Sequence, residues 1–183
     1  MKNNTVVSKI LILIVIGSLF ACDQNYGSGV RPAEETMEKI FGKMEDSGKY
    51  PVLDRTDTLA GIDENKNGIR DDIDLYISKQ GFTPEQEKAV AQAAAVMQRS
   101  VTIDVKNKRA LAQLQADQDR SATCLTRVKF GVNGEVIGLS FALDIESLTA
   151  NTKKRLKNYL AYNHTLDGST WSPDDYVGDP CVK

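Results

Sequence analysis

Residues 63–74, Asp-Glu-Asn-Lys-Asn-Gly-Ile-Arg-Asp-Asp-Ile-Asp, place oxygen-bearing side chains at loop positions 1, 3, 5, 9 and 12 and a glycine at position 6. Calcium takes roughly six to eight oxygen ligands at about 2.3 to 2.6 Å, and a chain with ligands on alternate residues can wrap the ion only by turning sharply at a glycine. The spacing therefore predicts a calcium site. The expected ligands are the backbone carbonyl of Ile69 and the side chains of Asp63, Asn65, Asn67, Asp71 and Asp74.

This loop resembles the EF-hand loop and, more closely, the calcium loops of thrombospondin type 3 repeats, which also carry aspartate at positions 9 and 12. An EF-hand ends in glutamate and has an apolar residue at position 8, whereas this chain has Asp74 and Arg70 there. Neutral Asn65 and Asn67 lower the charge that opposes the ion, which predicts an affinity of roughly 10⁻⁵ to 10⁻³ M. The alternative is a polar turn followed by an N-capped helix.

The amino terminus is typical of a signal peptide. Lys2 and Lys9 precede the apolar run of residues 10–20, which is too short to cross a hydrocarbon core of about 30 Å. We therefore expect residues 1–21 to be removed on export.

The sequence Leu19-Phe20-Ala21-Cys22 resembles a lipobox, the processing signal of bacterial lipoproteins. The resemblance implies that Cys22 is acylated and holds the mature chain at the membrane, because two or three acyl chains bury enough methylene groups for stable anchoring. Residues 22–31 are then a flexible tether. Asp23 resembles the inner-membrane retention signal of enterobacterial lipoproteins. The alternative is an ordinary cleaved secretion signal that leaves Cys22 as a free or disulfide-bonded thiol.

The remaining cysteines, Cys124 and Cys181, form an even pair in a chain that we expect to reach an oxidising compartment. This predicts a disulfide between them. Such a bond would fasten the last residues of the chain onto the body of the domain.

Length and charge bound the remaining possibilities. The chain has 183 residues, and residues 32–183 are enough for one domain with a sizeable core. It has 23 basic and 25 acidic side chains. This balance is not that of a nucleic-acid-binding protein, which concentrates positive charge against phosphates.

Hydrophobic spacing predicts that residues 32–183 form a small, mainly helical domain around the calcium loop. Thr83-Pro84-Glu85-Gln86 is a capping box, with proline where no intrahelical hydrogen bond is due. The expected helices run from Pro32 to a stop at Gly48, from Asp72 to Lys79, from a Thr83 cap to about Val101, from Val105 to about Arg120, and from an Asn151 cap to near Gly168.

The segment from Thr126 to Leu143 fits two structures. Alternating Val128, Phe130 and Val132 before Asn133-Gly134 fit a short β-hairpin near residues 126–140. A buried helix after Gly134 is the other structure, and we favour it slightly because a lone hairpin is only marginally stable.

Two groups near the carboxyl terminus are candidate binding surfaces. The basic turn could face anionic headgroups or an acidic partner, but we expect a solvated helix face. The aromatic group could form a ligand platform, but we expect it to pack the tail onto the core. The basic turn is Lys153, Lys154, Arg155 and Lys157; the aromatic group is Tyr159, Tyr162, His164, Trp171 and Tyr176.

Catalysis finds little support in the sequence. His164 is the single histidine, and its neighbours Asn163 and Thr165 match no catalytic motif. We therefore expect no enzymatic activity.

The whole arrangement resembles small uncharacterised lipoproteins of Gram-negative bacteria, on the residues Thr58 to Ile77 and Asn151 to Gly168. The resemblance implies a location in the cell envelope, facing the periplasm, and supplies no mechanism. We expect a membrane-anchored lipoprotein with a calcium-binding loop, acting as a structural module or binding a protein partner in the envelope. An envelope hydrolase and a solute-binding lipoprotein are the alternatives.

Overall fold

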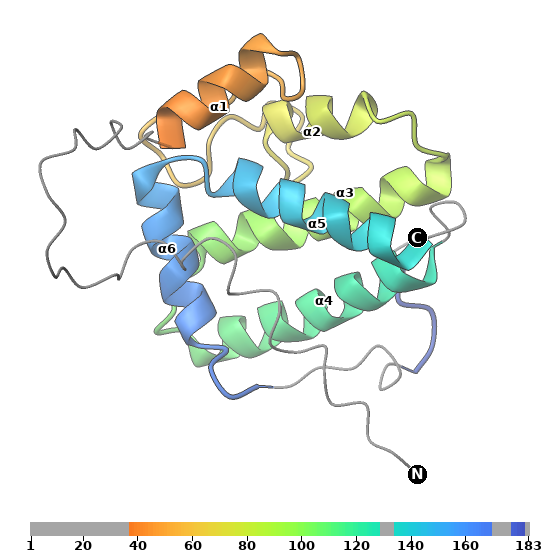
Figure 1. Ribbon diagram of the computed structural model, residues 1–183. Helices are drawn as coiled ribbons and strands as arrows, with labels where there is room; N and C mark the ends of the chain where they lie inside the picture. Colours follow the sequence, from red (N-terminus) through yellow and green to blue (C-terminus); the bar gives the residue numbers. More distant parts are fainter. Residues whose placement is uncertain (1–36, 129–133, 170–176, 182–183) are drawn as a thin grey trace, which may run out of the picture. The chain divides into compact units, whose positions relative to one another are not determined.

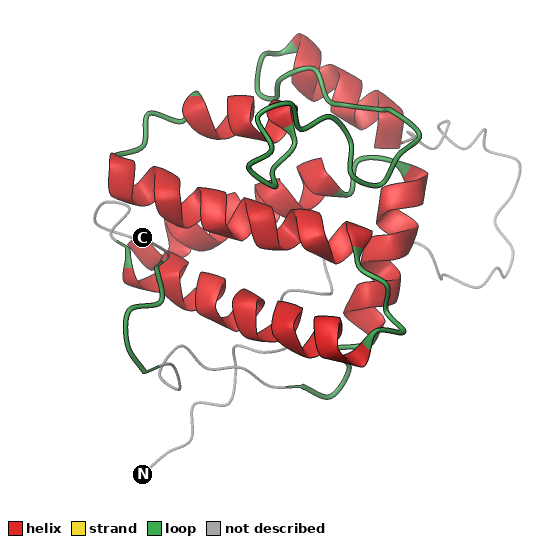
Figure 2. Ribbon diagram, turned by 180° about the vertical axis from the view of Figure 1, so that it is seen from behind, coloured by secondary structure: helices red, strands yellow, loops and turns green. Residues whose placement is uncertain are grey.

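The computed structural model describes residues 37–128, 134–169 and 177–181. Within these residues the chain forms helices and no strand, which confirms the predicted mainly helical fold (Figure 1, Figure 2). The helices are α1 (Met37–Asp46), α2 (Asp71–Ser78), α3 (Pro84–Thr102), α4 (Lys108–Arg127), α5 (Gly134–Thr149) and α6 (Lys153–His164). In these described segments, no helix combines the length and the apolar character that crossing a bilayer requires. The predicted signal peptide, Cys22 and the tether lie outside the described residues.

Helix α3 is the centre of the fold, because it packs against α2, α4, α5 and α6 (Figure 1). Its inward stripe of Val90, Ala94 and Val101 is at most 1% exposed, at the spacing of one face of a helix. The capping box at its start is confirmed. The backbone N of Gln86 donates to Thr83 Oγ1 at 3.3 Å, and the backbone N of Thr83 donates to Gln86 Oε1 at 2.9 Å. These bonds satisfy backbone groups that a first helical turn leaves unpaired.

The apolar interior has two parts. The larger part joins α1, α2, α3, α4 and α5 with the segment that precedes the candidate calcium loop. The smaller part fastens α6 onto α3 and α4, and burying each large apolar side chain stabilises this contact by about 1.5 to 3 kcal/mol. The smaller part consists of Val101, Leu114, Ala150, Tyr159 and Tyr162, and the larger part includes Phe41, Leu53, Ile69, Ile73, Val90, Ile145 and Leu148.

The hairpin alternative for residues 126–140 is wrong. Helix α4 continues to Arg127, and Gly134 begins α5 instead of completing a two-residue turn. Ile145 and Leu148 of α5 are at most 1% exposed, and α5 packs against both α3 and α4. A helix buried against two others satisfies its own backbone, whereas a lone two-stranded ribbon is marginal. Asn133 lies outside the described residues.

Helix α4 differs from its predicted bounds at both ends. It begins at Lys108 instead of Val105, because the Asn107 side chain accepts a hydrogen bond from the backbone N of Ala110 at 3.1 Å and acts as the N-cap. It continues beyond Arg120 to Arg127.

Candidate calcium loop and the arginine cluster behind it

The candidate calcium loop, residues 63–74, leads from an irregular segment into the first turn of α2. Gly68 has a φ of +86°, in the left-handed region that a glycine adopts without the cost of a side chain. Asp63 stabilises this turn, because its carboxylate accepts hydrogen bonds from the backbone N of Asn67 at 3.2 Å and of Gly68 at 3.0 Å. Gly68 is therefore the turning point of the loop.

Asn65 and Asn67 fold their side chains back onto the loop. Oδ1 of Asn65 accepts from the backbone N of Asn67 at 3.0 Å, and Oδ1 of Asn67 accepts from the backbone N of Ile69 at 2.8 Å. Each forms an Asx turn. Both Nδ2 groups donate to Oδ2 of Asp74, at 3.0 and 2.8 Å. The twelfth loop position therefore reaches across to the third and the fifth.

Asp71 and Ile69 complete the predicted ligand set. The Asp71 carboxylate accepts from the backbone N of Glu64 at 3.1 and 3.3 Å, and the backbone N of Asp71 donates to the Ile62 carbonyl at 2.9 Å. The Ile69 side chain is 4% exposed and anchors the loop in the larger core. The predicted side-chain ligands thus take part in hydrogen bonds that close one small loop.

The side-chain oxygen atoms of this loop are of the kind that calcium binds, but in the structure they accept hydrogen bonds. Among the described residues, no group of three or more histidine, cysteine, aspartate or glutamate side chains is placed to hold a metal ion. Each asparagine Oδ1 that accepts one backbone hydrogen bond has a second lone pair left for an ion. Coordination therefore requires the carboxylates of Asp63, Asp71 and Asp74 to draw together. An EF-hand-like coordination sphere stays a prediction.

An open depression adjoins the loop. Its walls come from the loop itself, from α2 and from α3, and they include Asn65, Asn67, Asp71 and Asp74. From α3, Glu87 adds a further carboxylate. The sequence pattern did not connect Glu87 with the loop, because Glu87 lies in α3 and α2 separates α3 from the loop.

Next to the loop lies a set of buried polar and charged side chains that the sequence did not predict, which we call the arginine cluster: Asp54, Arg70, Asp72, Asn151 and Arg155. The side chains of Arg70 and Arg155 are 0% exposed. Arg70 pairs with Asp72 through Nε–Oδ1 at 2.9 Å and Nη2–Oδ2 at 2.6 Å. Arg155 pairs with Asp54 through Nη2–Oδ2 at 3.4 Å. Two cations thus face two anions, as burial of charge requires.

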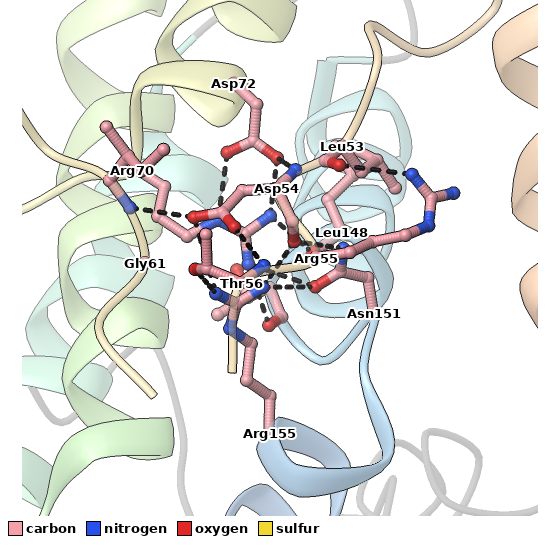
Figure 3. Close-up of polar contacts among 12 residues, drawn as sticks. Leu53, Asp54, Arg55, Thr56, Gly61, Arg70, Asp72, Leu148, Asn151 and Arg155 are labelled. Atoms are coloured by element: carbon pink, nitrogen blue, oxygen red, sulfur yellow. Dashed lines mark hydrogen bonds and ion pairs between the residues drawn. The ribbon is translucent and has the colours of Figure 1, made fainter. Parts of the chain in front are cut away.

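Asn151 joins the two halves of the arginine cluster. Figure 3 shows both guanidinium groups converging on its side chain, where Oδ1 accepts from Nη1 of Arg70 at 3.1 Å and from Nη1 of Arg155 at 2.9 Å. Its Nδ2 donates to the Asp54 carbonyl at 2.9 Å. The predicted capping role of Asn151 is therefore wrong, and Thr152 caps α6 instead.

The prediction that the basic turn is a solvated helix face is wrong for Arg155. Lys153, Lys154 and Lys157 are exposed as predicted, but Arg155 points into the protein. Successive helical residues are separated by about 100° of rotation, so one cation in a basic run can face inward. Its charge then requires the anions of the arginine cluster.

Burial, hydrogen bonds and neighbouring charges shift the pKa values of Asp54 and Arg155. Burial alone would raise the pKa of the Asp54 carboxyl, but hydrogen bonds from Thr56 and Ile62 and the charge of Arg155 outweigh burial and lower the pKa to about 2. Burial, together with the nearby charge of Arg70, lowers the pKa of Arg155 below its usual value. Asp54 is therefore a carboxylate at neutral pH.

Gly61 lets the backbone pass close over the arginine cluster. Its φ is +73°, and a Cβ atom there would lie 2.3 Å from Cδ of Arg70 and 2.5 Å from Oδ2 of Asp54. No side chain fits this position, since both neighbours are fixed by ion pairs.

No protein-family model, curated protein or solved structure matches this chain. The candidate calcium loop and the arginine cluster are therefore the features on which a function has to be argued.

The carboxyl-terminal aromatic residues do not form a common surface in the described part of the chain. Tyr159 and Tyr162 are 8% and 1% exposed and belong to the smaller core. The side chain of His164 is 85% exposed, and its Nδ1 lies 2.6 Å from a carboxylate oxygen of Asp167. Trp171 and Tyr176 lie outside the described residues.

The sulfur atoms of Cys124 and Cys181 lie 2.06 Å apart, at disulfide distance. The segment around Cys181 is also held by its backbone, because the Pro180 carbonyl accepts from Gln92 Nε2 at 3.0 Å and from Arg120 Nε at 3.1 Å. These contacts place residues 177–181 against α3 and α4.

Proposed function

We propose that this chain is a lipoprotein of the bacterial cell envelope whose loop 63–74 binds calcium and thereby fixes α1 and the irregular segment after it onto the helical body. One observation carries the proposal. Asp63, Asn65 and Asn67 are each oriented by hydrogen bonds from the loop backbone, and Asp74 closes onto the two asparagines. Each asparagine Oδ1 keeps a lone pair for an ion, and the oxygen atoms stand on the alternate residues that a calcium loop uses.

The expected effect of calcium is rigidity, because the loop is already closed by hydrogen bonds. At a free calcium concentration about ten times the dissociation constant, binding would stabilise the folded state by roughly 1.4 kcal/mol. Two neutral asparagine ligands favour weak binding, with a dissociation constant of roughly 10⁻⁵ to 10⁻³ M. Such a site fills where calcium is near millimolar.

Three features support an envelope location. The apolar run of residues 10–20 and the lipobox-like sequence that ends at Cys22 fit export and acylation. The Cys124–Cys181 pair suits an oxidising compartment. Asp23 supports retention at the inner membrane, with the domain facing the periplasm.

The module is proposed to be structural or to bind a protein partner in the envelope. A hydrolase would need a cleft that combines a carboxylate with His164 or a serine, but His164 lies on the surface beside Asp167. A solute-binding protein would need the carboxyl-terminal aromatic side chains to line a cavity, but Tyr159 and Tyr162 are packed in the core. Neither alternative gains support from the described residues.

Calorimetric titration of the Cys22→Ser chain with calcium, after EDTA treatment and dialysis, tests the metal site. We expect one site in the 10⁻⁵ to 10⁻³ M range and a higher melting temperature in millimolar calcium. Asp63→Asn and Asp74→Asn keep the side-chain shape and remove a charged ligand, so each should weaken binding at least tenfold.

Glu64→Gln is the matched control, because it removes the same charge from the same loop at a position outside the ligand set. It should bind calcium like the unchanged chain. A melting temperature that does not respond to calcium, or equal losses in Asp63→Asn and Glu64→Gln, would count against a specific site. Labelling with radioactive palmitate, lost in Cys22→Ser, tests the lipid anchor independently.

A further inference from the structure

Arg70 is the eighth residue of the candidate calcium loop, and its side chain leaves the loop to reach the end of a distant helix. Its Nη2 donates to the Leu148 carbonyl at 3.2 Å, and its Nη1 donates to the Thr149 carbonyl at 3.3 Å. These are the last two residues of α5. Carbonyl groups there have no intrahelical partner, and a cation is favourable at this end of a helix. Arg70 therefore caps α5.

The junction between α5 and α6 also holds the segment that enters the loop. Arg155, in the first turn of α6, donates through Nε to the carbonyls of Thr58 and Leu59 at 3.2 and 3.3 Å. Asp54, its ion-pair partner, accepts from the backbone N of Ile62 at 2.7 Å through Oδ2. Ile62 directly precedes the first loop ligand.

The segments that enter and leave the loop are thus both bonded to the arginine cluster. Asp72 fixes the side that leaves the loop, because its carboxylate holds Arg70 and also accepts from the backbone N of Asp54 at 2.9 Å. The Asn151 side chain lies between the two arginines and bonds to both (Figure 3). A change at Asn151 therefore reaches both sides of the loop through fixed, buried contacts.

We propose that Arg70 is a positioning residue for the calcium loop, and that Asn151, acting through Arg70 and Arg155, couples calcium affinity to the junction between α5 and α6. This inference rests on the proposed calcium function and adds its regulation. Coupling of this kind is reciprocal in free energy, so whatever loosens the junction weakens calcium binding, and calcium in turn stabilises the junction.

The first test uses amide hydrogen exchange of the full chain, purified in detergent, with calcium or with EDTA. The reporters are the amides of Ala150 and Leu156, which donate to Glu146 O and Thr152 O at 3.0 and 2.8 Å on either side of Asn151. We expect calcium to slow their exchange about tenfold. The amide of Val128, at the far end of α4, is the internal control and should not change. Unchanged exchange at Ala150 and Leu156 under saturating calcium would overturn the coupling.

The second test measures calcium affinity in variants at a temperature where circular dichroism shows each one folded. Asn151→Ala removes the shared acceptor and should weaken calcium binding about tenfold. Asn151→Asp keeps an acceptor for both arginines but loses the donor to the Asp54 carbonyl, so it should restore part of the affinity. Leu114→Ala opens a cavity in the smaller core without touching either arginine, so it should lower the melting temperature while weakening calcium binding far less than Asn151→Ala.

The outcomes separate the two proposals. If the unchanged chain binds calcium and Asn151→Ala binds it equally well, the coupling is wrong and the calcium function stands. If Leu114→Ala weakens binding as much as Asn151→Ala, the effect is one of general stability and the coupling is again wrong. If the unchanged chain binds no calcium in the titration, the calcium function fails and the coupling fails with it.

Discussion

Arg70 and Asp72, two residues apart at the start of α2, form a buried ion pair in which two guanidinium nitrogens meet two carboxylate oxygens at 2.9 and 2.6 Å. The side chain of Arg70 is 0% exposed and that of Asp72 is 8% exposed. A pair of this kind is costly to break from one side, because the remaining charge stays buried without a partner. It ties the loop to the core of the domain.

Asp72→Ala should therefore destabilise the domain strongly. Removing one partner of a buried ion pair costs about 3 to 5 kcal/mol, and the backbone N of Asp54 also loses its acceptor. Urea unfolding followed by circular dichroism would measure the loss. Asp117→Ala is the control, since it breaks a pair with the 47% exposed Arg99 and should cost less than about 1 kcal/mol. Equal losses in the two variants would mean that Arg70 does not depend on Asp72.

Gly61→Ala should destabilise the domain more than Gly48→Ala. Both glycines have positive φ, +73° and +74°, so alanine is strained by roughly 1 kcal/mol at either position. Only at Gly61 would the new Cβ meet the Arg70 side chain, whereas nothing lies within 4 Å of a Cβ at Gly48. Thermal unfolding of the two variants compares strain alone with strain plus overlap. A melting temperature for Gly61→Ala that is no lower than that of Gly48→Ala would contradict the close approach.

Local features of the fold could be predicted from the sequence. The start of α3 follows from Thr83 and Gln86, because a capping box is complete within four residues. The stripe of Val90, Ala94 and Val101 follows from helical periodicity, which does not depend on the rest of the chain. The loop closure around Gly68 is local in the same sense.

The arginine cluster could not be predicted in this way, because its contacts join distant segments. Arg70 stands in the sequence as a departure from an apolar loop position, and Arg155 as one of several basic residues. Their burial depends on Asp54 and Asn151, which come from opposite ends of the domain. The one signal in the sequence was Arg70, because an EF-hand loop has an apolar residue at that position. It could have suggested an arginine that points inward and needs a buried acid.

The stability of the domain should depend on pH through Asp54. Its pKa is lowered to about 2 in the folded state, from 3.8. A lowered pKa contributes stability above the unfolded value, and this contribution is lost as the pH falls toward the folded value. We expect a loss of about 2 kcal/mol between pH 5 and pH 2 from this group.

Asp54→Asn isolates this effect, because asparagine cannot ionise. The variant should be less stable at neutral pH, and the difference from the unchanged chain should narrow as the pH falls from 5 to 2. Urea unfolding across that range measures the difference. Asp57→Asn is the control, since the Asp57 side chain is 92% exposed and its pair with Lys154 lies on the surface. A difference for Asp54→Asn that stays constant with pH would show that its carboxyl is not specially stabilised in the folded state.

Reduction of the Cys124–Cys181 bond should destabilise the domain and release its last residues. The cysteines are 57 residues apart, and in the chain-entropy model a crosslink of that span stabilises the folded state by about 4 kcal/mol. The reduced chain should unfold at a lower urea concentration than the oxidised chain. It should also be cut sooner by carboxypeptidase, because only hydrogen bonds such as those to the Pro180 carbonyl would then hold residues 177–181. The double variant Cys124→Ala/Cys181→Ala should behave like the reduced chain and should not respond to the reductant. Equal stability of the oxidised and reduced chains would contradict a stabilising disulfide between these two cysteines.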